Sequence, residues 1–312
     1  MTGGHEPVLL AETLKALAVR PDGRYLDATF GRGGHSAAIL ARLAPGGRLV
    51  AMDCDDQAIE VATRCFGEDP RMTIVKGRFS MIERYREQAP WQGGFDGILF
   101  DLGVSSPQLD NATRGFSFRR EGPLDMRMDR HAHPSAAEWL NGAPEAEIAQ
   151  VLRDFGEERY ARRIARAVVA TRAVTPLATT AQFAALVARE IPRREPGQDP
   201  ATRSFQAVRI RINDELGELT RALPAARDLL RPGGRLVVIS FHSLEDRIVK
   251  QFFVHESRGD SYPTRLPVPQ AWLAPRLRVL GRALRAGPAE LTANPRSRSA
   301  ILRVAQRLGD SS

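Results

Sequence analysis

Glycines and acidic side chains stand together at the ends of short apolar segments in the first third of the sequence. Residues 24–29 are predicted to form a strand that runs into a glycine-rich turn, and Asp53 closes a second strand 22 positions after Gly31. Glycines after a first strand allow a tight turn and the close approach of a ligand, and a carboxylate at this spacing binds ribose hydroxyls. The combination favours a nucleoside cofactor over an ordinary turn.

The turn departs from two known glycine patterns at one position each. A dinucleotide-binding loop has the pattern G-x-G-x-x-G, whereas position 36 is Ser. The methyltransferase variant has an acidic residue and then glycines at alternate positions. Asp27, Gly31 and Gly33 fit that variant, while Thr29 stands where the first glycine is often found. The prediction therefore depends on the strand before the turn and on Asp53 after it.

Another acidic residue ends the predicted strand at residues 95–101. In open α/β sheets ligands bind beyond the carboxyl ends of the strands, so Asp101 is expected to face the same crevice as Gly31 and Asp53. The residues that follow, 102–108, are similar to the Ser-Pro-Pro-Tyr loop of amino-methyltransferases, which receives an exocyclic amine. The alternative is that Asp101 caps a turn or a helix at the strand end.

Alternating strand and helix patterns position these side chains. Such alternation is typical of a parallel sheet with helices on both faces. Capping patterns predict helix starts at Ser80, with Glu83, and at Ser243, with Asp246; His242 lies either at the crevice edge or in that second cap. The predicted strands are residues 24–29, 48–53, 72–75, 95–101, 235–240, 277–280 and 300–305.

The strand pattern is interrupted between residues 102 and 201, where loops and successive helical patterns predict an insertion. A single long helix at 202–230 is expected to lead back to the sheet. The predicted fold class is α/β, a methyltransferase-type (Rossmann-like), mostly parallel sheet with a helical insertion domain. We expect the first part of the core at 1–107, the insertion, as an RNA-recognition domain, at 108–207 and the second part of the core at 208–312.

The chain is basic, and its charge is unevenly distributed. The 312 residues carry 45 Lys and Arg against 37 Asp and Glu, a formal net charge of +8, and 42 of those cations are arginines. The net charge is −3 for residues 1–110, +4 for residues 111–210 and +7 for residues 211–312. This asymmetry indicates a polyanion-binding surface in the later two thirds, although an arginine-rich genome explains the charge alone equally well.

Composition excludes several classes of protein. Hydrophobic residues at 43% and charged residues at 26% exclude disorder of the whole chain. No apolar stretch approaches the ~18 residues of a membrane helix, and the first ten residues lack a signal-peptide pattern. Cys54 and Cys65 are too few for a disulfide framework or a four-ligand zinc site. We expect a cytoplasmic protein with no membrane association, and His131 and His133 support no metal site.

Eight segments, in order over nearly the whole chain, resemble the bacterial 16S ribosomal RNA cytosine-N4 methyltransferase family. They are residues 5–10, 27–36, 101–110, 114–118, 122–129, 156–159, 202–210 and 240–247, while 258–275 match least. The resemblance implies an enzyme that uses S-adenosylmethionine to methylate N4 of a decoding-centre cytidine of the small ribosomal subunit.

The resemblance also implies site residues. The cofactor would be contacted by Gly33, Gly34, His35, Asp53, Phe79, Asp101 and Gln108. The two glycines would admit its methionine part, Asp53 would accept from the ribose hydroxyls and Phe79 would pack on the adenine. The alternatives are an ordinary core residue for Phe79 and a surface histidine for His35.

The candidate catalytic residues are Asp101, Ser106 and Pro107. Cytosine N4 is a poor nucleophile because its lone pair is conjugated into the ring. Acceptors for its protons favour the tetrahedral nitrogen of the transition state, and the proton then passes to Asp101 or to water. The cytidine is expected to leave its stack to reach the methyl donor.

Arginines interleaved with aromatic residues predict contacts to unpaired bases and phosphates, with buried phenylalanines as the alternative. Nine arginines but one acid, Glu290, lie between residues 265 and 307, which predicts a phosphate-binding surface. The candidate RNA-binding residues are Arg114, Phe116, Phe118, Arg119, Arg203, Arg209, Arg296 and Arg298. The expected partner is 16S ribosomal RNA or the small ribosomal subunit, without an obligatory protein partner.

Two other functions fit the same motifs. Methylation of another nucleic-acid amine, such as DNA cytosine or adenine N6, would use the same loop, and only the family resemblance separates these reactions. A nucleotide-binding or RNA-binding protein without catalysis is the second alternative.

Overall fold

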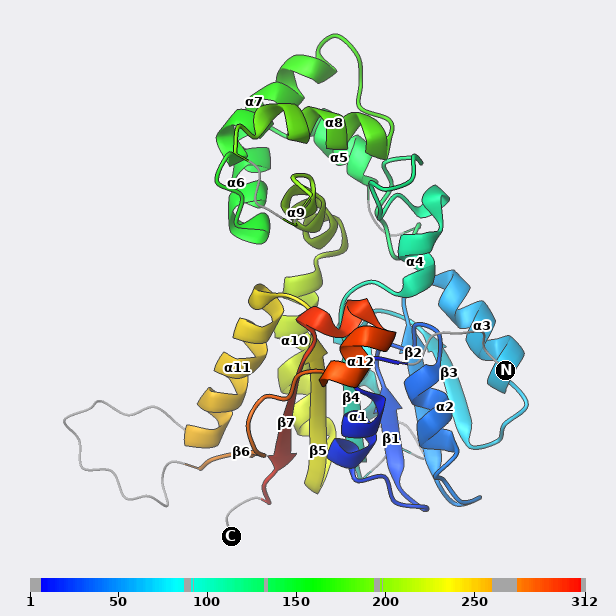
Figure 1. Cartoon of the computed structure of the whole chain (residues 1–312). Helices are drawn as coiled ribbons and strands as arrows, with labels where there is room; N and C mark the ends of the chain where they lie inside the picture. Colours follow the sequence, from blue (N-terminus) through cyan, green and yellow to red (C-terminus); the bar gives the residue numbers. More distant parts are fainter. Residues whose placement is uncertain are drawn as a thin grey trace, which may run out of the picture. The chain divides into compact units, whose positions relative to one another are not determined.

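The computed structural model describes residues 7–86, 91, 93–131, 134–193, 197, 199–259 and 274–309. Of the positions considered in the sequence, residues 5, 6, 133 and 260–273 lie outside these ranges. The chain divides into two compact units (Figure 1), unit 1 with Met1–Gly103 and Leu216–Ser312, and unit 2 with Val104–Glu215. The divisions expected from the sequence lie after residues 107 and 207. The second division lies later because α9 (Thr202–Asn213) contributes Phe205, Val208 and Ile212 to the core of unit 2.

A seven-stranded sheet forms the centre of unit 1, in the order β3-β2-β1-β4-β5-β7-β6. The first five of these strands are parallel, whereas β7 is antiparallel to both of its neighbours. The mostly parallel α/β sheet predicted from the sequence is thereby confirmed. The strands are β1 (Arg24–Asp27), β2 (Arg48–Asp53), β3 (Met72–Lys76), β4 (Phe95–Asp101), β5 (Leu230–Ser240), β6 (Leu277–Val279) and β7 (Ile301–Arg307).

Helices cover both faces of this sheet. Successive residues of its strands point in opposite directions, so each strand presents apolar side chains to both faces. Val50 and Met52 lie in one apolar cluster with residues of η1 (Phe79–Arg86), α10 (Glu215–Leu229) and α11 (Ser243–Arg258). Leu49 and Ala51 face the other way. The helices on that face are α1 (Leu10–Leu17), α2 (Gly34–Leu40) and α3 (Asp56–Phe66).

Unit 2 is helical and has its own apolar core. The expected helices of the insertion are all present, and Phe183 and Phe205 pack against each other between them with ring centroids 5.2 Å apart. The helices are α4 (Ser106–Asp110), η2 (Ala112–Arg114), α5 (Ala136–Gly142), α6 (Glu145–Gly156), α7 (Ala161–Arg172), α8 (Thr180–Glu190) and α9. Short segments α12 (Pro288–Ala293) and η4 (Pro295–Ser299) complete unit 1.

The structure corrects three local predictions. The long helix at 202–230 is two helices, because Asp214 has a left-handed φ of 52° that ends α9. Ser80 does not start a helix; it lies inside η1, and its N–H donates to Glu218. The N-cap of α11 is His242, one residue before the predicted Ser243.

No helix in the described ranges has both the length and the apolar character that a membrane span requires.

Candidate active site

Three carboxylates end neighbouring strands of the unit 1 sheet. Asp27, Asp53 and Asp101 are the last residues of β1, β2 and β4. Because β1 pairs with both β2 and β4 in parallel, the carboxyl ends of these strands lie side by side at one edge of the sheet. This edge is where ligands bind in open α/β sheets.

Asp27 is buried and organises the glycine turn. Its Oδ2 accepts a 2.7 Å hydrogen bond from the Ser36 hydroxyl, and its Oδ1 accepts from the Thr29 N–H at 3.2 Å. Burial raises the pKa of Asp27, an effect that the Ser36 bond opposes. Ser36, which breaks the dinucleotide-binding pattern, is therefore the donor that this buried carboxylate requires.

The turn itself depends on glycine for backbone geometry and for packing. Gly31 and Gly33 have φ values of 55° and 78°, which favour glycine. A Cβ on Gly34 would lie 2.2 Å from Pro7 Cγ, and one on Gly33 would lie 2.4 Å from the Phe30 ring. The approach of a ligand is the reason that the sequence suggests for these two glycines. The structure shows that neighbouring side chains of the protein already require them.

Asp53 is held by the turn and has an altered acidity. Its Oδ2 accepts from the Gly31 N–H at 2.8 Å and its Oδ1 from the Asp55 N–H at 2.9 Å. Burial nevertheless raises its pKa to about 6. Each oxygen keeps a second lone pair, so a pair of hydroxyl donors would both satisfy Asp53 and favour its charged form.

His35 and Asp101 form a contact that the sequence did not reveal. His35 is only 5% exposed, which excludes the surface histidine considered above, and its Nε2 lies 3.5 Å from Asp101 Oδ2. Burial by itself lowers the pKa of His35, but the carboxylates of Asp101 and Asp27 raise it by more. His35 is thereby biased toward the cation that pairs with Asp101.

Asp101 is oriented from its backbone as well. Its N–H donates a 2.6 Å hydrogen bond to Thr29 Oγ1, which joins the end of β4 to the loop after β1. Its Oδ1 is buried and has no hydrogen-bond partner in the parts of the chain that the structure describes. Asp101 therefore offers a fixed, unused acceptor at the sheet edge, and Thr29 has a specific role where a glycine was expected.

Phe79 lies just after β3, partly buried against the core. Its ring meets that of Phe100 edge to face, with centroids 5.7 Å apart. The buried carboxylate of Glu218, on α10, accepts from the Ser80 N–H at 3.3 Å and lies 3.6 Å from Arg78. Glu218 fixes the segment that carries Phe79, and no local sequence signal could have found it. Phe79 is thus a core residue over part of its ring, as one of the two interpretations predicted. Its stacking on adenine stays a prediction.

Ser106, Pro107 and Gln108 belong to unit 2. They form the first turn of α4, where Gln108 Oε1 accepts from the Ser105 N–H at 2.9 Å in a capping box. This oxygen therefore has a structural task. The catalytic role of Ser106 and Pro107 and the cofactor contact of Gln108 stay predictions.

The structure corrects the RNA-binding assignment of Arg114 and Phe116 and gives Arg209 a partner within unit 2. Arg114 is 1% exposed and donates to the carbonyls of Arg127 and Met128 at 3.0 and 3.1 Å. Its guanidinium also lies 5.7 Å from the buried ring of Phe116. Arg209 makes a two-point ion pair with Glu215, 2.8 Å at each contact. These contacts lie inside unit 2. Arg114 and Phe116 are too deeply buried to form a surface for RNA, whereas an RNA contact of half-buried Arg209 stays a prediction.

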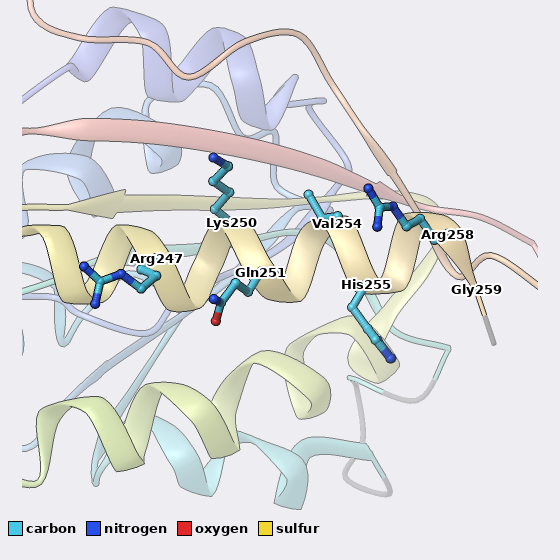
Figure 2. A pocket seen from close by; sticks show the side chains of 7 residues that line it. All are labelled: Arg247, Lys250, Gln251, Val254, His255, Arg258 and Gly259. Atoms are coloured by element: carbon cyan, nitrogen blue, oxygen red, sulfur yellow. The ribbon is translucent and has the colours of Figure 1, made fainter. Parts of the chain in front are cut away.

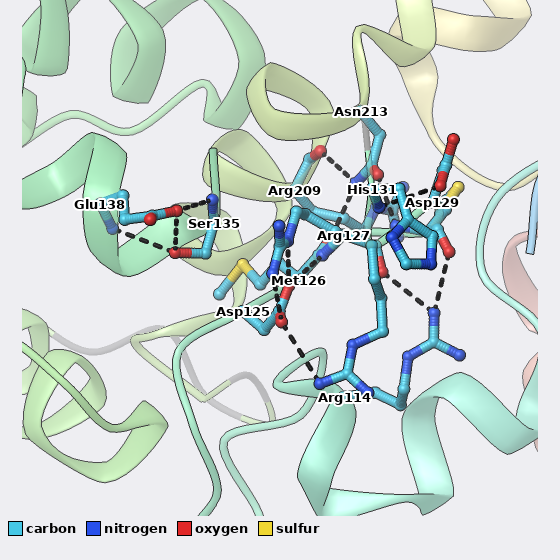
Figure 3. Close-up of polar contacts among 12 residues, drawn as sticks. Arg114, Asp125, Met126, Arg127, Asp129, His131, Ser135, Glu138, Arg209 and Asn213 are labelled. Carbon is cyan, nitrogen blue, oxygen red and sulfur yellow. Dashed lines mark hydrogen bonds and ion pairs between the residues drawn. The ribbon is translucent and has the colours of Figure 1, made fainter. Parts of the chain in front are cut away.

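The same loop is fixed at further points, which Figure 3 shows. Asn213 donates to the Met126 carbonyl and accepts from the Met128 N–H, both at 2.8 Å. Burial alone raises the pKa of Asp125, but its hydrogen bonds from Arg127 outweigh that effect and lower it. The segment at 122–129 is therefore a network of internal contacts.

The remaining RNA-binding candidates differ in exposure. Phe118 packs edge to face on Phe205 with centroids 5.1 Å apart, so it is largely a core residue. Arg203 and Arg296 are half-buried, whereas Arg119 and Arg298 are exposed. Exposure is compatible with the predicted role of Arg119 and Arg298 but does not test it.

His242 belongs to the cap of α11. Its Nδ1 accepts from the Glu245 N–H at 3.4 Å, and Glu245 Oε2 accepts from the Phe241 N–H at 2.8 Å. The capping interpretation is confirmed, with Glu245 in the place expected for Asp246. Asp246 instead receives two hydrogen bonds from Arg303, at 2.7 and 2.9 Å.

The edge formed by β1, β2 and β4 fits the expected nucleoside cofactor. It presents a desolvated carboxylate, Asp53, suited to ribose hydroxyls, and an unpartnered acceptor, Asp101 Oδ1. Both lie beside the positive-φ turn at Gly31 and Gly33. The acceptor-rich edge also suits a cationic ligand that presents donors.

Comparison with known proteins gives a match over nearly the whole chain. The model of the MraW methylase family matches residues 2–308. "Ribosomal RNA small subunit methyltransferase H" of Thioalkalivibrio sulfidiphilus is 56% identical over 305 residues, 97% of each chain. The protein of that name from Aromatoleum aromaticum is also 56% identical, over 98% of this chain and 97% of its own. Among solved structures, an rRNA methylase from Streptococcus thermophilus aligns with a TM-score of 0.42 at 10% identity, covering 98% of this chain and 100% of its own.

Proposed function

Since this chain belongs to the MraW methylase family, it is an S-adenosylmethionine-dependent methyltransferase, and we propose that its acceptor is N4 of a decoding-centre cytidine in 16S ribosomal RNA. The observation that carries the site assignment is Asp101, which is oriented by Thr29 and His35 while its Oδ1 keeps no partner among the described residues. The names of the relatives support a substrate in the small ribosomal subunit.

The residues at the sheet edge bind and orient the cofactor. Asp53 accepts from the two ribose hydroxyls, and Phe79 packs on the adenine. Gly33, Gly34, His35, Asp101 and Gln108 complete the proposed contacts. When bound, S-adenosylmethionine supplies a methyl group that its sulfonium already activates.

The protein must then make N4 of cytosine a better nucleophile. Asp101 Oδ1 accepts a hydrogen bond from the amine, which favours the tetrahedral nitrogen of the transition state. The methyl group that the cofactor would supply leaves N4 with an excess proton, which Asp101 or water accepts. His35, whose Nε2 lies 3.5 Å from Asp101 Oδ2, holds this carboxylate in place, so it acts as a positioning residue. Ser106 and Pro107 supply further backbone acceptors.

The substrate is proposed to reach this edge as an extruded base. Cytosine N4 is paired and stacked in a helix, so the cytidine must leave its stack. Exposed arginines outside the edge, including Arg119 and Arg298, contact the surrounding phosphates. This reaction places the protein in the bacterial cytoplasm with the small ribosomal subunit.

Mass mapping of ribosomal RNA tests the proposed acceptor. RNA from a strain without this gene should lack one methyl group on a decoding-centre cytidine, and the purified protein with S-adenosylmethionine should restore it to isolated small subunits. Methylation at an adenine, or on DNA alone, would overturn the proposed acceptor. A folded protein that binds the cofactor but transfers no methyl group would favour the non-catalytic alternative.

Asp101→Asn tests the chemistry of the site. The amide retains the shape of the side chain but is a weaker acceptor and takes no proton, so kcat should fall about 100-fold. The Kd for S-adenosylmethionine should change only a few-fold in calorimetry. Asp22→Asn, at an exposed acid of the same unit, is the matched control. Full turnover by Asp101→Asn would contradict the assignment.

A further inference from the structure

One face of α11 carries a row of basic side chains beside a hollow. Its successive lining residues are alternately three positions and one position apart, which places them on a single side of the helix. Figure 2 shows them along α11, and they enclose about 430 Å³. The lining residues are Arg247, Lys250, Gln251, Val254, His255, Arg258 and Gly259.

The acidic residues of α11 all have partners, and one of these partners belongs to the row: His255 Nδ1 lies 3.3 Å from Glu256 Oε1. Glu245 is 2% exposed and belongs to the helix cap, and Asp246 receives the two hydrogen bonds of Arg303. Glu256 is 4% exposed and accepts from Arg227 at 2.8 Å. The exposed side chains of the row therefore include the cations Arg247, Lys250 and Arg258 and no carboxylate, while Glu245 and Glu256 are buried.

Helix stabilisation explains only part of this distribution. Cations in the last turn interact favourably with the helix dipole, which accounts for His255 and Arg258. Arg247 and Lys250 lie in the first half of the helix, where the dipole gives no such benefit. Along a rise of about 1.5 Å per residue, Arg247 and Arg258 are about 16 Å apart, which is enough to reach more than one phosphate of a nucleic-acid strand.

We propose that this face of α11 is a docking surface for the phosphate backbone of the ribosomal RNA substrate. The inference rests on the proposed function. The positive charge of this face is complementary to a polyanion, and the proposed substrate identifies that polyanion as ribosomal RNA. Arg247, Lys250 and Arg258 contact phosphates, and Gln251 donates a neutral hydrogen bond within the hollow. These contacts carry no base specificity; they hold the subunit while the target base enters the active site.

A triple variant, Arg247→Gln with Lys250→Gln and Arg258→Gln, tests the surface. The control is Lys15→Gln with Arg42→Gln and Arg64→Gln, which removes the same charges from exposed positions of the same unit. Binding to unmethylated small subunits is measured between 0.05 and 0.3 M salt, a range chosen around physiological ionic strength at about 0.15 M. The α11 variant should bind at least about tenfold more weakly at 0.15 M, and its slope of log affinity against log salt should be shallower by about 2–3.

The control triple should keep the wild-type slope and affinity within about twofold, and both variants should keep the wild-type Kd for S-adenosylmethionine. Equal losses in the two variants would reduce the effect to net charge and overturn the docking surface. Loss of binding to anionic phospholipid vesicles with unchanged subunit binding would overturn it in favour of a membrane surface.

The test of the docking surface and the test of the proposed acceptor can fail independently. If wild-type protein binds subunits through α11 but mass mapping finds no methylated cytidine, the docking surface stands and the acceptor assignment fails. If methylation occurs and the α11 variant binds like the control, the acceptor assignment stands and the docking surface fails.

Discussion

At the scale of single residues, both departures from the expected glycine patterns have a physical cause. Thr29 replaces a glycine and accepts from the N–H of Asp101, and Ser36 replaces another and donates to buried Asp27. A glycine at either position would leave a polar group of the site without this partner. The turn is built to orient carboxylates as well as to admit a ligand.

Ser36→Gly should therefore destabilise the protein although it creates the dinucleotide-binding pattern. The variant loses a hydrogen bond to a buried carboxylate and adds glycine to α2, so the free energy of unfolding should fall by about 2–4 kcal/mol at pH 7. Denaturant titration measures it. Ser36→Ala separates the two causes, since it loses only the bond.

The sign of the pH effect gives a second check on Ser36. Without the hydroxyl, the already raised pKa of Asp27 should rise further. The variant therefore loses stability relative to wild type only where Asp27 is charged in the wild-type protein. The stability difference from wild type should shrink between pH 7 and pH 4. A difference that is constant over this range would exclude Asp27 as its source.

Asp53 predicts how cofactor affinity depends on pH. Its pKa of about 6 in the free protein means that it holds a proton at lower pH, whereas ribose hydroxyls favour the charged acceptor. Affinity for S-adenosylmethionine should therefore rise with pH through about 6 and level off above it. Calorimetry from pH 5 to pH 8 measures this.

Asp53→Asn should bind about 10–100-fold more weakly at pH 8 and lose the step near pH 6. Any pH dependence that is left in this variant belongs to other groups, of which His35, with its raised pKa, is the nearest candidate. An unchanged step in Asp53→Asn would show that Asp53 does not face the ribose.

At the scale of elements, the loop at 114–131 shows how a basic and aromatic segment can be structural. Arg114 donates to backbone carbonyls and Arg127 to the carboxylate of Asp125 within unit 2, and Asn213 at the end of α9 binds the segment. Asp214, in the left-handed conformation, then ends α9. The helix therefore ends directly after Asn213, the residue that binds the loop. The composition of such a loop does not distinguish it from an RNA-binding one.

Arg114→Leu should lower the free energy of unfolding by about 2–4 kcal/mol, because it leaves buried carbonyls without a charged donor. Thermal or denaturant unfolding measures the loss. Arg119→Leu, at an exposed position of the same loop, is the control and should change stability by less than about 0.5 kcal/mol. Weakened RNA binding with unchanged stability in Arg114→Leu would restore its predicted RNA contact.

At the scale of the whole molecule, folding brings sequence segments of opposite net charge into one unit. Unit 1 holds 28 basic and 22 acidic residues, a net charge of +6, whereas unit 2 holds 17 and 15, a net charge of +2. The basic C-terminal segment thus shares a unit with the acidic N-terminal one, which carries Asp27, Asp53 and Asp101. Of the net charge of +8, +6 belongs to unit 1.

The C-terminal arginines should separate into two groups. Arg282, Arg285 and Arg298 are exposed, and their joint change to Gln should reduce the salt dependence of subunit binding while sparing the Kd of the cofactor. Arg303 is bound to Asp246, so Arg303→Gln should lower stability by about 1–3 kcal/mol with little change in the salt slope. Binding isotherms at several salt concentrations and unfolding curves distinguish the two. The reverse pattern would contradict this division.

The sequence by itself determined the strands, the parallel sheet, the helical insertion and the acidic residues at the strand ends. Each depends on periodicity, glycine spacing or capping within a few tens of residues, and such patterns are local. The tertiary structure decided the partners: His35 with Asp101, Glu218 with the segment of Phe79, Gly34 with Pro7 and Arg114 with the interior. These pairs join residues from 13 to 138 positions apart, or depend on which side of a loop is buried. No local pattern records a contact that only the packing of separate elements creates.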